Sequence, residues 1–531
     1  MKHITALLFF LVGSAAADQA PITIDGFFDD WAGVDLAWQD PLGDAGGPVD
    51  LGSLWIADDE RFLFLRFESG GEFDLSENNN LRLYLDTDAD AGTGIAVGGI
   101  GAELEWRAGD RFGIFVHLGV ETVVRHNDIR FRGGPTVSST GFEIAIGRDT
   151  LPDGVNELFT GSQIRVVLVD TGSGDTLPDA GSVLTYTLDV GVASAVATRS
   201  FERRHPDDLR IITHNVLSDN PFNAMDAPLF ERLYSVVDPD ILHLQEIYNN
   251  SAAQTRDLIA SWLGGDWYAA SVADCKTVSR YPIVGSWAID GNMAVLIDTT
   301  ASIGTEMLCI NAHFPCCGND FNRQREVDAI MAFIRDAYSD GGVLTLGSEV
   351  PVMIAGDLNL VGFSQQIVTL LTGDIQNETL YGPDQAPDPD GTDLINIVSR
   401  QTEKQMGYTW RSDSSSFWPG HLDYLIYSDS NLTRRHDFLV YTPEMSAGEL
   451  TARGLLAGDS DASDHLVVVA DFASFCPADL NDDRLLDLSD INAFVIGFMN
   501  QDSIADLAEP FGLFDLADVI AFIASFTGGC P

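Results

Sequence analysis

The sequence is short of positive charge. Of its 531 residues, 29 are Lys or Arg and 80 are Asp or Glu, which gives a formal net charge of −51. The only lysines are Lys2, Lys276 and Lys404. Proteins that bind nucleic acid non-specifically neutralise phosphates with a basic face, and this composition argues against such a face. The acidity is typical of a solvated, salt-adapted surface, and it still permits a metal site that offsets the charge around one substrate group.

Long apolar runs are missing as well. Residues 1–17 begin with the basic Lys2, continue through apolar residues from Ala6 to Val12, and end in the small residues Ala15–Ala17, which is the pattern of a secretory signal peptide. This run is shorter than the ~18 apolar residues of a membrane-spanning helix, and no later segment reaches that length. The sequence therefore predicts an exported protein without a transmembrane segment, either secreted or associated with the cell surface.

Cysteine is scarce, with six residues and no CxxC pair to indicate a zinc site. An exported protein meets an oxidising environment, in which cysteines form disulfides. Cys476 and Cys530 enclose the last segment, so we expect them to pair with each other. The two residues of Cys316–Cys317 are adjacent, so we expect each to bond elsewhere, with Cys275 and Cys309 as candidate partners.

Residues 18–197 show the alternating apolar pattern of β-strands, for example at Arg61–Phe67 and Leu81–Leu85. No long helical pattern interrupts them, which predicts an N-terminal antiparallel β-sandwich. The segments Ile24–Trp31 and Asp86–Gly94 resemble those of carbohydrate-binding family 9 and DOMON sandwiches, and this resemblance implies a carbohydrate ligand. Within the second segment, Asp86, Asp88 and Asp90 alternate as calcium ligands can, although an acidic loop between strands has the same pattern.

The rest of the chain divides into a linker at 198–207, a central domain at 208–474 and a module at 476–531. In the central domain apolar strands alternate with helical patterns, as an α/β fold requires. The last module is an internal duplication, because Asp487–Phe494 is echoed by Asp515–Phe522. Two short helices, each behind an acidic loop, are predicted there.

The first acidic loop of this module fits the register of an EF-hand loop. Oxygen donors occupy positions 1, 3, 5, 7, 9 and 12 of the loop, namely Asp479, Asn481, Asp483, Leu485 through its carbonyl, Asp487 and Asp490. This loop resembles that of a dockerin module, which implies bound Ca²⁺ and a cohesin-like or cell-surface partner. Arg484 stands where glycine is expected, and Ala508 and Pro510 of the second copy lack side-chain oxygens. We therefore expect one good calcium site and a degenerate second one.

Seven polar clusters mark the central domain, most of them beside an apolar strand. In chain order they contain Asn215, Glu246, Arg280–Tyr281, His313, Asp357 with Asn359, Asp423, and Asp464–His465. Each cluster alone is more often a turn or a cap. Together, in this order, they resemble the endonuclease/exonuclease/phosphatase superfamily from about Leu209 to Phe472. The resemblance implies a DNase I-like fold, a four-layer αββα sandwich with the polar residues at one end of two packed sheets.

The chemistry of phosphodiester cleavage explains these residue types. In-line attack by water needs a base for the water, stabilisation of the phosphorane-like charge and an acid for the leaving oxygen. Glu246 is a hard oxygen donor suited to Mg²⁺ or Mn²⁺, with Asn215 and Asp464 as further candidates for the metal region. Asp357 is expected to accept a proton from the attacking water, and Asn359 to donate to a phosphate oxygen.

The two histidines complete this set. His465 can hydrogen-bond to the phosphate or protonate it, and Asp423 would orient its imidazole. His313 matches the second histidine of the superfamily, which implies a general-acid or phosphate-binding role. Arg280 and Tyr281 are substrate-binding candidates, although an Arg-Tyr-Pro turn before a strand explains them equally.

These residues favour an exported, metal-dependent phosphodiesterase, with a nuclease as the first hypothesis. A sphingomyelinase- or phospholipase C-like enzyme acting on a phospholipid head group is the alternative, because the same site supports it. A non-catalytic adhesion or scaffold protein is the alternative of another class. The complete set of catalytic carboxylates and histidines argues against that last hypothesis.

Overall fold

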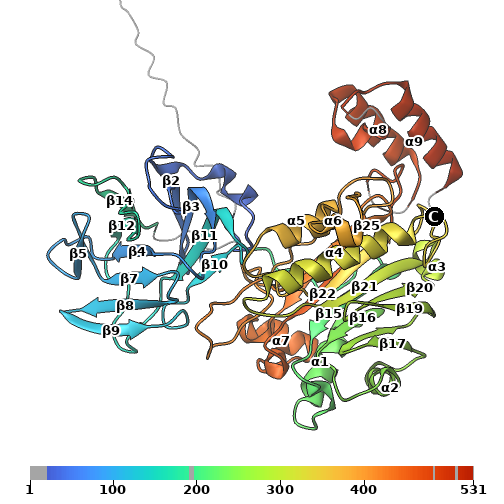
Figure 1. Cartoon of the computed structure of the whole chain (residues 1–531), viewed down its shortest axis with the longest axis horizontal. Coiled ribbons are helices and arrows are strands. Elements are labelled where there is room, and N and C mark those ends of the chain that lie inside the picture. Colours follow the sequence, from blue (N-terminus) through green and yellow to red (C-terminus); the bar gives the residue numbers. More distant parts are fainter. Residues whose placement is uncertain (1–20, 190–195, 482, 484, 509–511, 530–531) are drawn as a thin grey trace, which may run out of the picture.

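The computed structural model describes residues 21–189, 196–481, 483, 485–508 and 512–529. The predicted signal peptide at 1–17, Cys530, Arg484 and Pro510 lie outside these residues. Figure 1 shows a β-rich N-terminal part, a central part with two sheets and flanking helices, and a pair of C-terminal helices. Among the described residues, no helix is both long and apolar enough to cross a membrane.

The N-terminal part contains two main antiparallel sheets. The first has the strand order β1 (Leu36–Gln39), β2 (Leu51–Asp58), β3 (Phe62–Phe73), β11 (Ser139–Gly147), β10 (Arg132–Gly134). The second has the order β13 (Thr176–Leu177), β12 (Gln163–Asp170), β4 (Leu81–Asp86), β7 (Leu104–Arg107), β8 (Phe112–His117), β9 (Val120–Val124), with β14 (Leu184–Thr187) also on β12. A separate hairpin joins β5 (Ile95–Val97) and β6 (Ile100–Ala102).

Both of these sheets contribute to one apolar core. Leu54 and Leu65 of the first sheet belong to the same buried cluster as Leu83 and Leu85 of the second. Alternate residues of each strand point into this cluster, which explains the alternating apolar pattern of these strands in the sequence. We refer to residues 21–189 as the sandwich.

The central part holds two six-stranded sheets. The first has the order β17 (Tyr268–Val272), β18 (Cys275–Ser279), β16 (Ile241–Gln245), β15 (Leu209–Asn215), β26 (Val467–Ser474), β25 (Leu432–Val440). The second has the order β19 (Ile283–Ile289), β20 (Asn292–Ile297), β21 (Met307–His313), β22 (Val352–Asp357), β24 (Asp423–Tyr427), β23 (Ile395–Asn396). Their innermost strands are buried throughout, so they appear as continuous apolar runs.

Helices cover the outer faces of these sheets. The described helices are α1 (Ala227–Val237), α2 (Ala252–Leu263), α3 (Thr300–Ile303), α4 (Asp320–Ala337), α5 (Gln365–Thr372), α6 (Glu378–Tyr381) and α7 (Ala447–Arg453) in the central part, with α8 (Leu488–Asn500) and α9 (Leu516–Gly528) after it. Short 3-10 turns are η1 (Asp29–Gly33), η2 (Asn220–Phe222), η3 (Thr442–Glu444), η4 (Asp459–Ala462) and η5 (Ser503–Ala505).

Three buried clusters define the layers of the central part. One lies between the two sheets and includes Ile211 and Met353. A second packs the first sheet against α1 and α2, and a third packs the other sheet against α4 and α5. The layers therefore run helices, sheet, sheet, helices, as the resemblance implied.

The sandwich is docked on the central part. Trp418 of the central part is buried in the sandwich core, where its ring lies 4.9 Å from that of Phe131 and its indole N–H donates to the carbonyl of Gly133 at 3.2 Å. A separate cluster joins Trp31 and Phe62 of the sandwich to Tyr408 of the central part. These contacts fix the sandwich against the central sheets.

The C-terminal helices repeat the same local structure. Asp487 and Asp490 form a capping box at the start of α8, and Asp515 and Asp518 form one at the start of α9. The internal duplication read from the sequence therefore has a structural counterpart. The EF-hand geometry itself stays a prediction.

The cysteines of the central part do not pair as expected. Cys275 and Cys309 are free thiols buried in β18 and β21, and Cys316 and Cys317 are free and exposed after β21. The expected bonds fail because the first two side chains are packed inside the sheets. Cys476 is disulfide-bonded, and its pairing with Cys530 stays a prediction because Cys530 lies outside the described residues.

Candidate active site

The candidate catalytic residues meet at one end of the two central sheets. Asn215 ends β15 and Glu246 follows β16, and these strands are parallel. Asp357 ends β22, where it pairs with Asp423 at the start of the antiparallel β24. His465 lies just before β26. Parallel strands end together and antiparallel strands begin there, so residues far apart in sequence share one edge.

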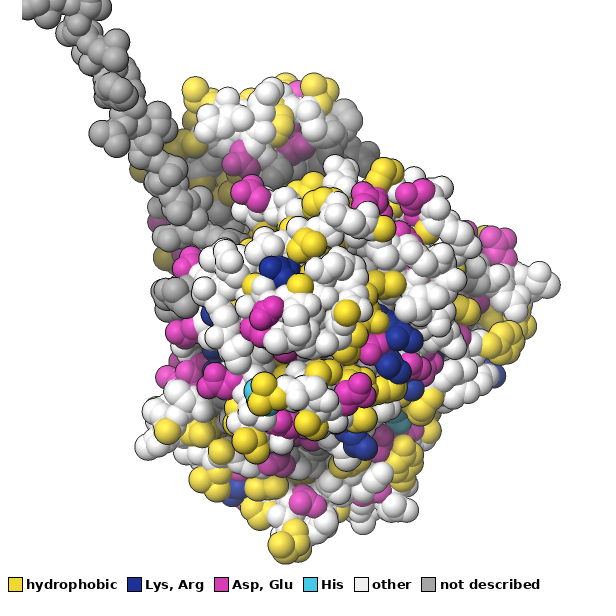
Figure 2. All heavy atoms as spheres, turned by 90° about the vertical axis from the view of Figure 1, so that its left-hand side faces the viewer, with side chains coloured by type: hydrophobic (Ala, Val, Ile, Leu, Met, Phe, Trp, Pro, Cys, Tyr) yellow, Lys and Arg dark blue, Asp and Glu magenta, His cyan; other side chains and the backbone are white. Residues whose placement is uncertain are grey.

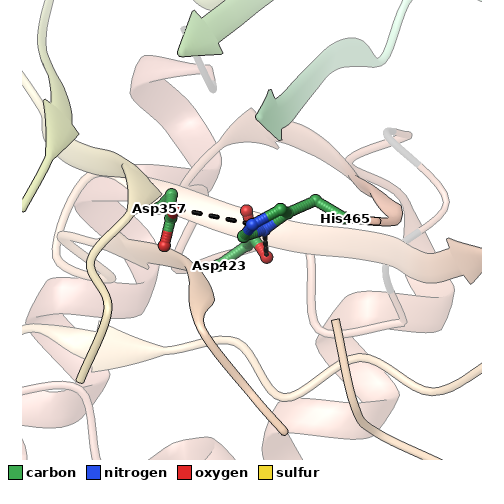
Figure 3. Close-up of side chains that lie close together, drawn as sticks. All are labelled: Asp357, Asp423 and His465. Carbon is green, nitrogen blue, oxygen red and sulfur yellow. Dashed lines mark hydrogen bonds and ion pairs between the residues drawn. The ribbon is translucent and has the colours of Figure 1, made fainter. Parts of the chain in front are cut away.

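His465 is held between two carboxylates (Figure 3). Its Nδ1 lies 2.8 Å from Oδ2 of Asp423, and its Nε2 lies 3.6 Å from Oδ2 of Asp357. Burial alone would lower the pKa of His465, but the negative charges of Asp423 and Asp357 outweigh it and raise the pKa to about 10. The imidazolium is therefore available near neutral pH as a donor toward the pocket.

Asn215 contacts both Glu246, the expected metal ligand, and Asp357, the expected base for the attacking water. Its Nδ2 donates to Oε1 of Glu246 at 3.1 Å and to Oδ2 of Asp357 at 2.9 Å. Burial raises the pKa of Asp357, which the charge of His465 opposes. A buried carboxylate with a raised pKa is better matched to accepting a proton near neutral pH.

His313 has a partner that the sequence did not reveal. Its Nδ1 lies 2.6 Å from Oδ2 of Asp274, while its Nε2 lies 3.6 Å from Oδ2 of Asp357. Burial opposes protonation of His313, but the hydrogen bond to Asp274 and the charge of Asp357 raise its pKa. The only sequence signal for Asp274 is its place directly before a strand, which many structural aspartates share.

Two backbone features keep this corner compact. Gly356 has a φ of +152°, and a Cβ there would lie 1.9 Å from the carbonyl oxygen of Ala312. Only glycine fits so close to the neighbouring strand. Glu246 and Asn359 have φ values of 63° and 46°, an uncommon conformation for residues with side chains. The amide of Asn359 donates to the carbonyl of Phe314 at 3.0 Å, so here it positions the loop between two strands.

Asp464 is anchored by a tryptophan that the sequence did not single out. Its Oδ2 accepts the indole N–H of Trp410 at 3.0 Å. His214 is also at this corner, and burial lowers its pKa to about 3, so it stays neutral. Its Nε2 lies 3.2 Å from the carbonyl oxygen of His465, so His214 has a structural role beside the candidate catalytic histidine.

Arg280 and Tyr281 do not belong to this site. Strand β18 is antiparallel to β16, so its end at Ser279 lies beside Ile241, at the edge opposite to Glu246. Arg280 pairs there with Asp238 at 2.9 Å and lies over the ring of Trp267, and Tyr281 packs on the core between the sheets. The direction of β18 therefore places Arg280 and Tyr281 away from the other candidate residues, contrary to the expectation that they bind substrate.

These residues line a pocket of about 720 Å³ between the sandwich and the central part. The pocket contains Glu246, His313, Asp357, Asp464 and His465. The sandwich contributes Asp74, Ser76, Pro135 and Thr136 to the same pocket. Five carboxylates and two histidines line it, with no Lys or Arg among the lining residues.

The donor set fits a divalent cation. Glu246 and Asp357 both bind one amide nitrogen, so two carboxylates lie together without an arginine or lysine among the pocket residues. Mg²⁺ takes few protein ligands and prefers such oxygens. Asp357, Asp423 and His465 also offer atoms within 4.8 Å of one another, and one oxygen of the buried Asp423 has no hydrogen-bond partner.

Two acidic loops lie outside the pocket, one in the sandwich and one in the C-terminal module. Asp86 and Asp88 lie together with Glu103, whereas Asp90 is not part of that group. In the C-terminal module, Asp490 accepts the backbone N–H groups of Leu480 and Asp487, and Asp483 accepts that of Leu485. Calcium binding by Asp479, Asn481, Asp483, Leu485, Asp487 and Asp490 stays a prediction.

A scan against protein-family models matches residues 212–465 to the Endonuclease/Exonuclease/phosphatase family. The central part of the chain is therefore similar to the domains of this family. The match begins in β15 and ends at His465, so it includes every residue of the corner described above. A search of curated proteins found no match.

Solved structures similar to this chain include three enzymes that cover about half of it. D. rerio TDP2 complexed with single-strand DNA product is 16% identical, covers 50% of this chain and 98% of its own, and has a TM-score of 0.33. ANGEL2, a 2′,3′-cyclic phosphatase in complex with adenosine-2′,3′-vanadate, is 16% identical, with coverages of 52% and 99% and a TM-score of 0.36. The human Nocturnin catalytic domain with bound sulfate is 15% identical, with coverages of 52% and 96% and a TM-score of 0.33.

Proposed function

We propose that this protein is an exported, divalent-metal-dependent phosphodiester hydrolase whose active site is the pocket beside Asp357. The observation that carries the proposal is that His465, His313 and Asp357 line one pocket, with Asp423 and Asp274 bound to the two histidines behind it, within residues that match the Endonuclease/Exonuclease/phosphatase family. Export rests on the signal-peptide pattern of residues 1–17.

The geometry supports one task for each group. A phosphate beside Nε2 of His465 and Nε2 of His313 would receive hydrogen bonds from two imidazolium groups as negative charge develops. Asp357 lies within reach of both histidines and would accept the proton of the attacking water. Asp423 and Asp274 hold the two rings by their Nδ1 atoms.

Glu246, with Asn215 beside it and Asp464 on the same pocket, would hold Mg²⁺ or Mn²⁺. A bound divalent ion would supply positive charge that stabilises the transition state. The acidic lining favours such an ion, because no lysine or arginine of the pocket can play this part. Ca²⁺ is proposed only for the C-terminal loop, whose partner would be a cohesin-like or cell-surface component.

Nucleic acid and a phospholipid head group are the two substrate classes that this chemistry admits. The test is an assay of the full chain on single-stranded DNA, duplex DNA, RNA, sphingomyelin and bis(p-nitrophenyl) phosphate, with Mg²⁺ or with EDTA. We expect hydrolysis of at least one diester that needs Mg²⁺ or Mn²⁺. Turnover that persists in EDTA would contradict metal dependence, and no turnover on any substrate would contradict the proposed activity.

A further inference from the structure

The sandwich forms one wall of the candidate active site. Asp74 and Ser76 follow β3, and Pro135 and Thr136 follow β10, and all four line the pocket that holds Asp357 and His465. The opposite walls come from the ends of the central strands. A substrate at Asp357 must therefore fit against residues of both parts of the chain.

Direct contacts hold this wall in place. The hydroxyl oxygen of Thr136 lies within hydrogen-bond distance of the carbonyl oxygens of Leu360 and His421, at 3.0 and 3.1 Å. Two residues further on, the backbone N–H of Ser138 donates to the carbonyl of Gly362 at 2.6 Å, beside a parallel bridge between Val137 and Gly362. Leu360 and Gly362 immediately follow the Asp357–Asn359 turn, so the wall is fixed to the loop that carries the catalytic carboxylate.

A second set of contacts closes the same boundary from the central part. The segment from Trp410 to Gly420 supplies several of the pocket's lining residues, and within it Trp418 is buried in the sandwich core. Next to it, the guanidinium of Arg111 lies 4.1 Å from the ring centre of Phe417. The aromatic lining is thus part of the interface between the two parts.

The chemistry of the pocket is acidic and aromatic. On the sandwich side Asp74 adds a carboxylate, and the central part adds the aromatic surface of Trp410, Phe417 and Tyr248. The view of the molecule in Figure 2 likewise shows Lys and Arg side chains scattered rather than gathered into a continuous basic track. A long polyanion needs cations along its backbone, and an aromatic or apolar ester group needs the kind of surface that this pocket offers.

We propose that the sandwich, by closing one side of the pocket against the aromatic residues of the central part, selects the substrate: a compact phosphodiester with a single negative charge and an apolar or aromatic ester group, rather than the interior of a nucleic-acid duplex. This inference rests on the proposed phosphodiesterase activity. Both the end of a single nucleic-acid strand and a small phospholipid contain such a phosphodiester. Asp74 and Ser76 of the wall would determine which of these substrates fits the pocket.

The first experiment compares substrates on the full chain with Mg²⁺. Bis(p-nitrophenyl) phosphate, the p-nitrophenyl ester of thymidine 5′-phosphate and a short-chain sphingomyelin represent compact diesters, and a closed circular duplex represents the excluded class. We expect a kcat/KM at least about a hundredfold higher, per phosphodiester, for one compact diester than for the duplex, the size of effect that exclusion from a productive position produces. Equal or better cleavage of the duplex would overturn the inference and leave the phosphodiesterase activity standing.

The second experiment changes the wall without touching the catalytic groups. Ser76→Trp should narrow the pocket and lower kcat/KM for the compact diester about tenfold or more, mainly through KM. Val123→Trp is the matched control, because Val123 is 68% exposed on β9 and does not line the pocket. An unchanged KM in the Ser76 variant, with a folded protein by circular dichroism, would overturn the role of the wall.

Asp74→Asn tests the charge of the wall. The asparagine keeps an oxygen for the N–H and hydroxyl of Ser76, which Asp74 accepts at 2.7 and 2.9 Å. We expect cleavage of single-stranded DNA relative to the compact diester to rise about threefold at low salt and less at high salt, because salt screens the repulsion between the half-buried Asp74 and the DNA phosphates. Glu121→Gln, an exposed acid on β9, is the control. An equal rise in both variants, or no rise, would overturn the role of Asp74.

Discussion

The pocket and the C-terminal module are both acidic, yet they use their carboxylates differently. In the pocket, Asp423, Asp274 and Asp357 face histidines, and their charges raise the pKa values of His465 and His313. In the module, Asp490 and Asp518 accept backbone N–H groups of the helix starts. An acidic region is therefore not enough to identify the active site of this protein. The groups that each carboxylate contacts distinguish the candidate active site from the acidic module.

Removing the central histidine should have the largest effect. We expect His465→Ala to lower kcat on a small diester at least about a thousandfold. The imidazolium stabilises the substrate mainly in the transition state, when negative charge develops on the phosphate and protons are transferred. His117→Ala, on β8 of the sandwich and away from the pocket, should leave kcat unchanged. Comparable losses in both variants would mean that His465 has no special role.

Chelation separates the two acidic regions next. EDTA should abolish turnover, and Mg²⁺ or Mn²⁺ should restore it, because no lysine or arginine among the pocket residues balances the charge of Glu246. Ca²⁺ should instead raise the helix signal of the C-terminal module in circular dichroism. If Ca²⁺ alone restores full turnover, or the helix signal does not change, the comparison as drawn is wrong.

Neutralising the partner of His313 should have an intermediate effect. Asp274 raises the pKa of His313, so Asp274→Asn lowers that pKa and the protonated form is lost at a lower pH. We expect the alkaline limb of the kcat profile to move to lower pH, with a loss of about tenfold or more at neutral pH. An alkaline limb that stays in place would assign it to another group, such as His465.

The smallest effect is expected in the C-terminal module. Asp490→Ala removes the acceptor of three backbone N–H groups, those of Leu480, Asn481 and Asp487, and should reduce the stability of the module by about 1–2 kcal/mol. Turnover on a small diester should not change. Thermal unfolding and the activity assay check the two halves of this prediction, and a fall in turnover would couple the module to the pocket.

The sequence predicted those parts of the site that follow local patterns. Asp357 and His465 adjoin continuous apolar strands, and their order along the chain resembles a known family, so their meeting could be expected. Asp274 has no such pattern around it. Arg280 was misassigned because the direction of β18, which places its end at the far edge of the sheet, depends on tertiary pairing.

The contribution of the sandwich could not be predicted either. Thr136 and Leu360 are 224 residues apart, and a hydroxyl that bonds a distant carbonyl leaves no periodic signal in either segment. The free thiols of Cys275 and Cys309 follow from the packing inside the sheets, which a count of cysteines does not reveal.

The most direct test of the central claim is hydrolysis of a small phosphodiester in ¹⁸O-labelled water by the full chain with Mg²⁺. Under the proposed function, water activated by Asp357 attacks phosphorus, so the label should appear in the phosphomonoester product. The His465→Ala variant should show at least about a thousandfold slower incorporation of label. Label in the alcohol product, or incorporation at the same rate in the variant, would contradict this account of the pocket.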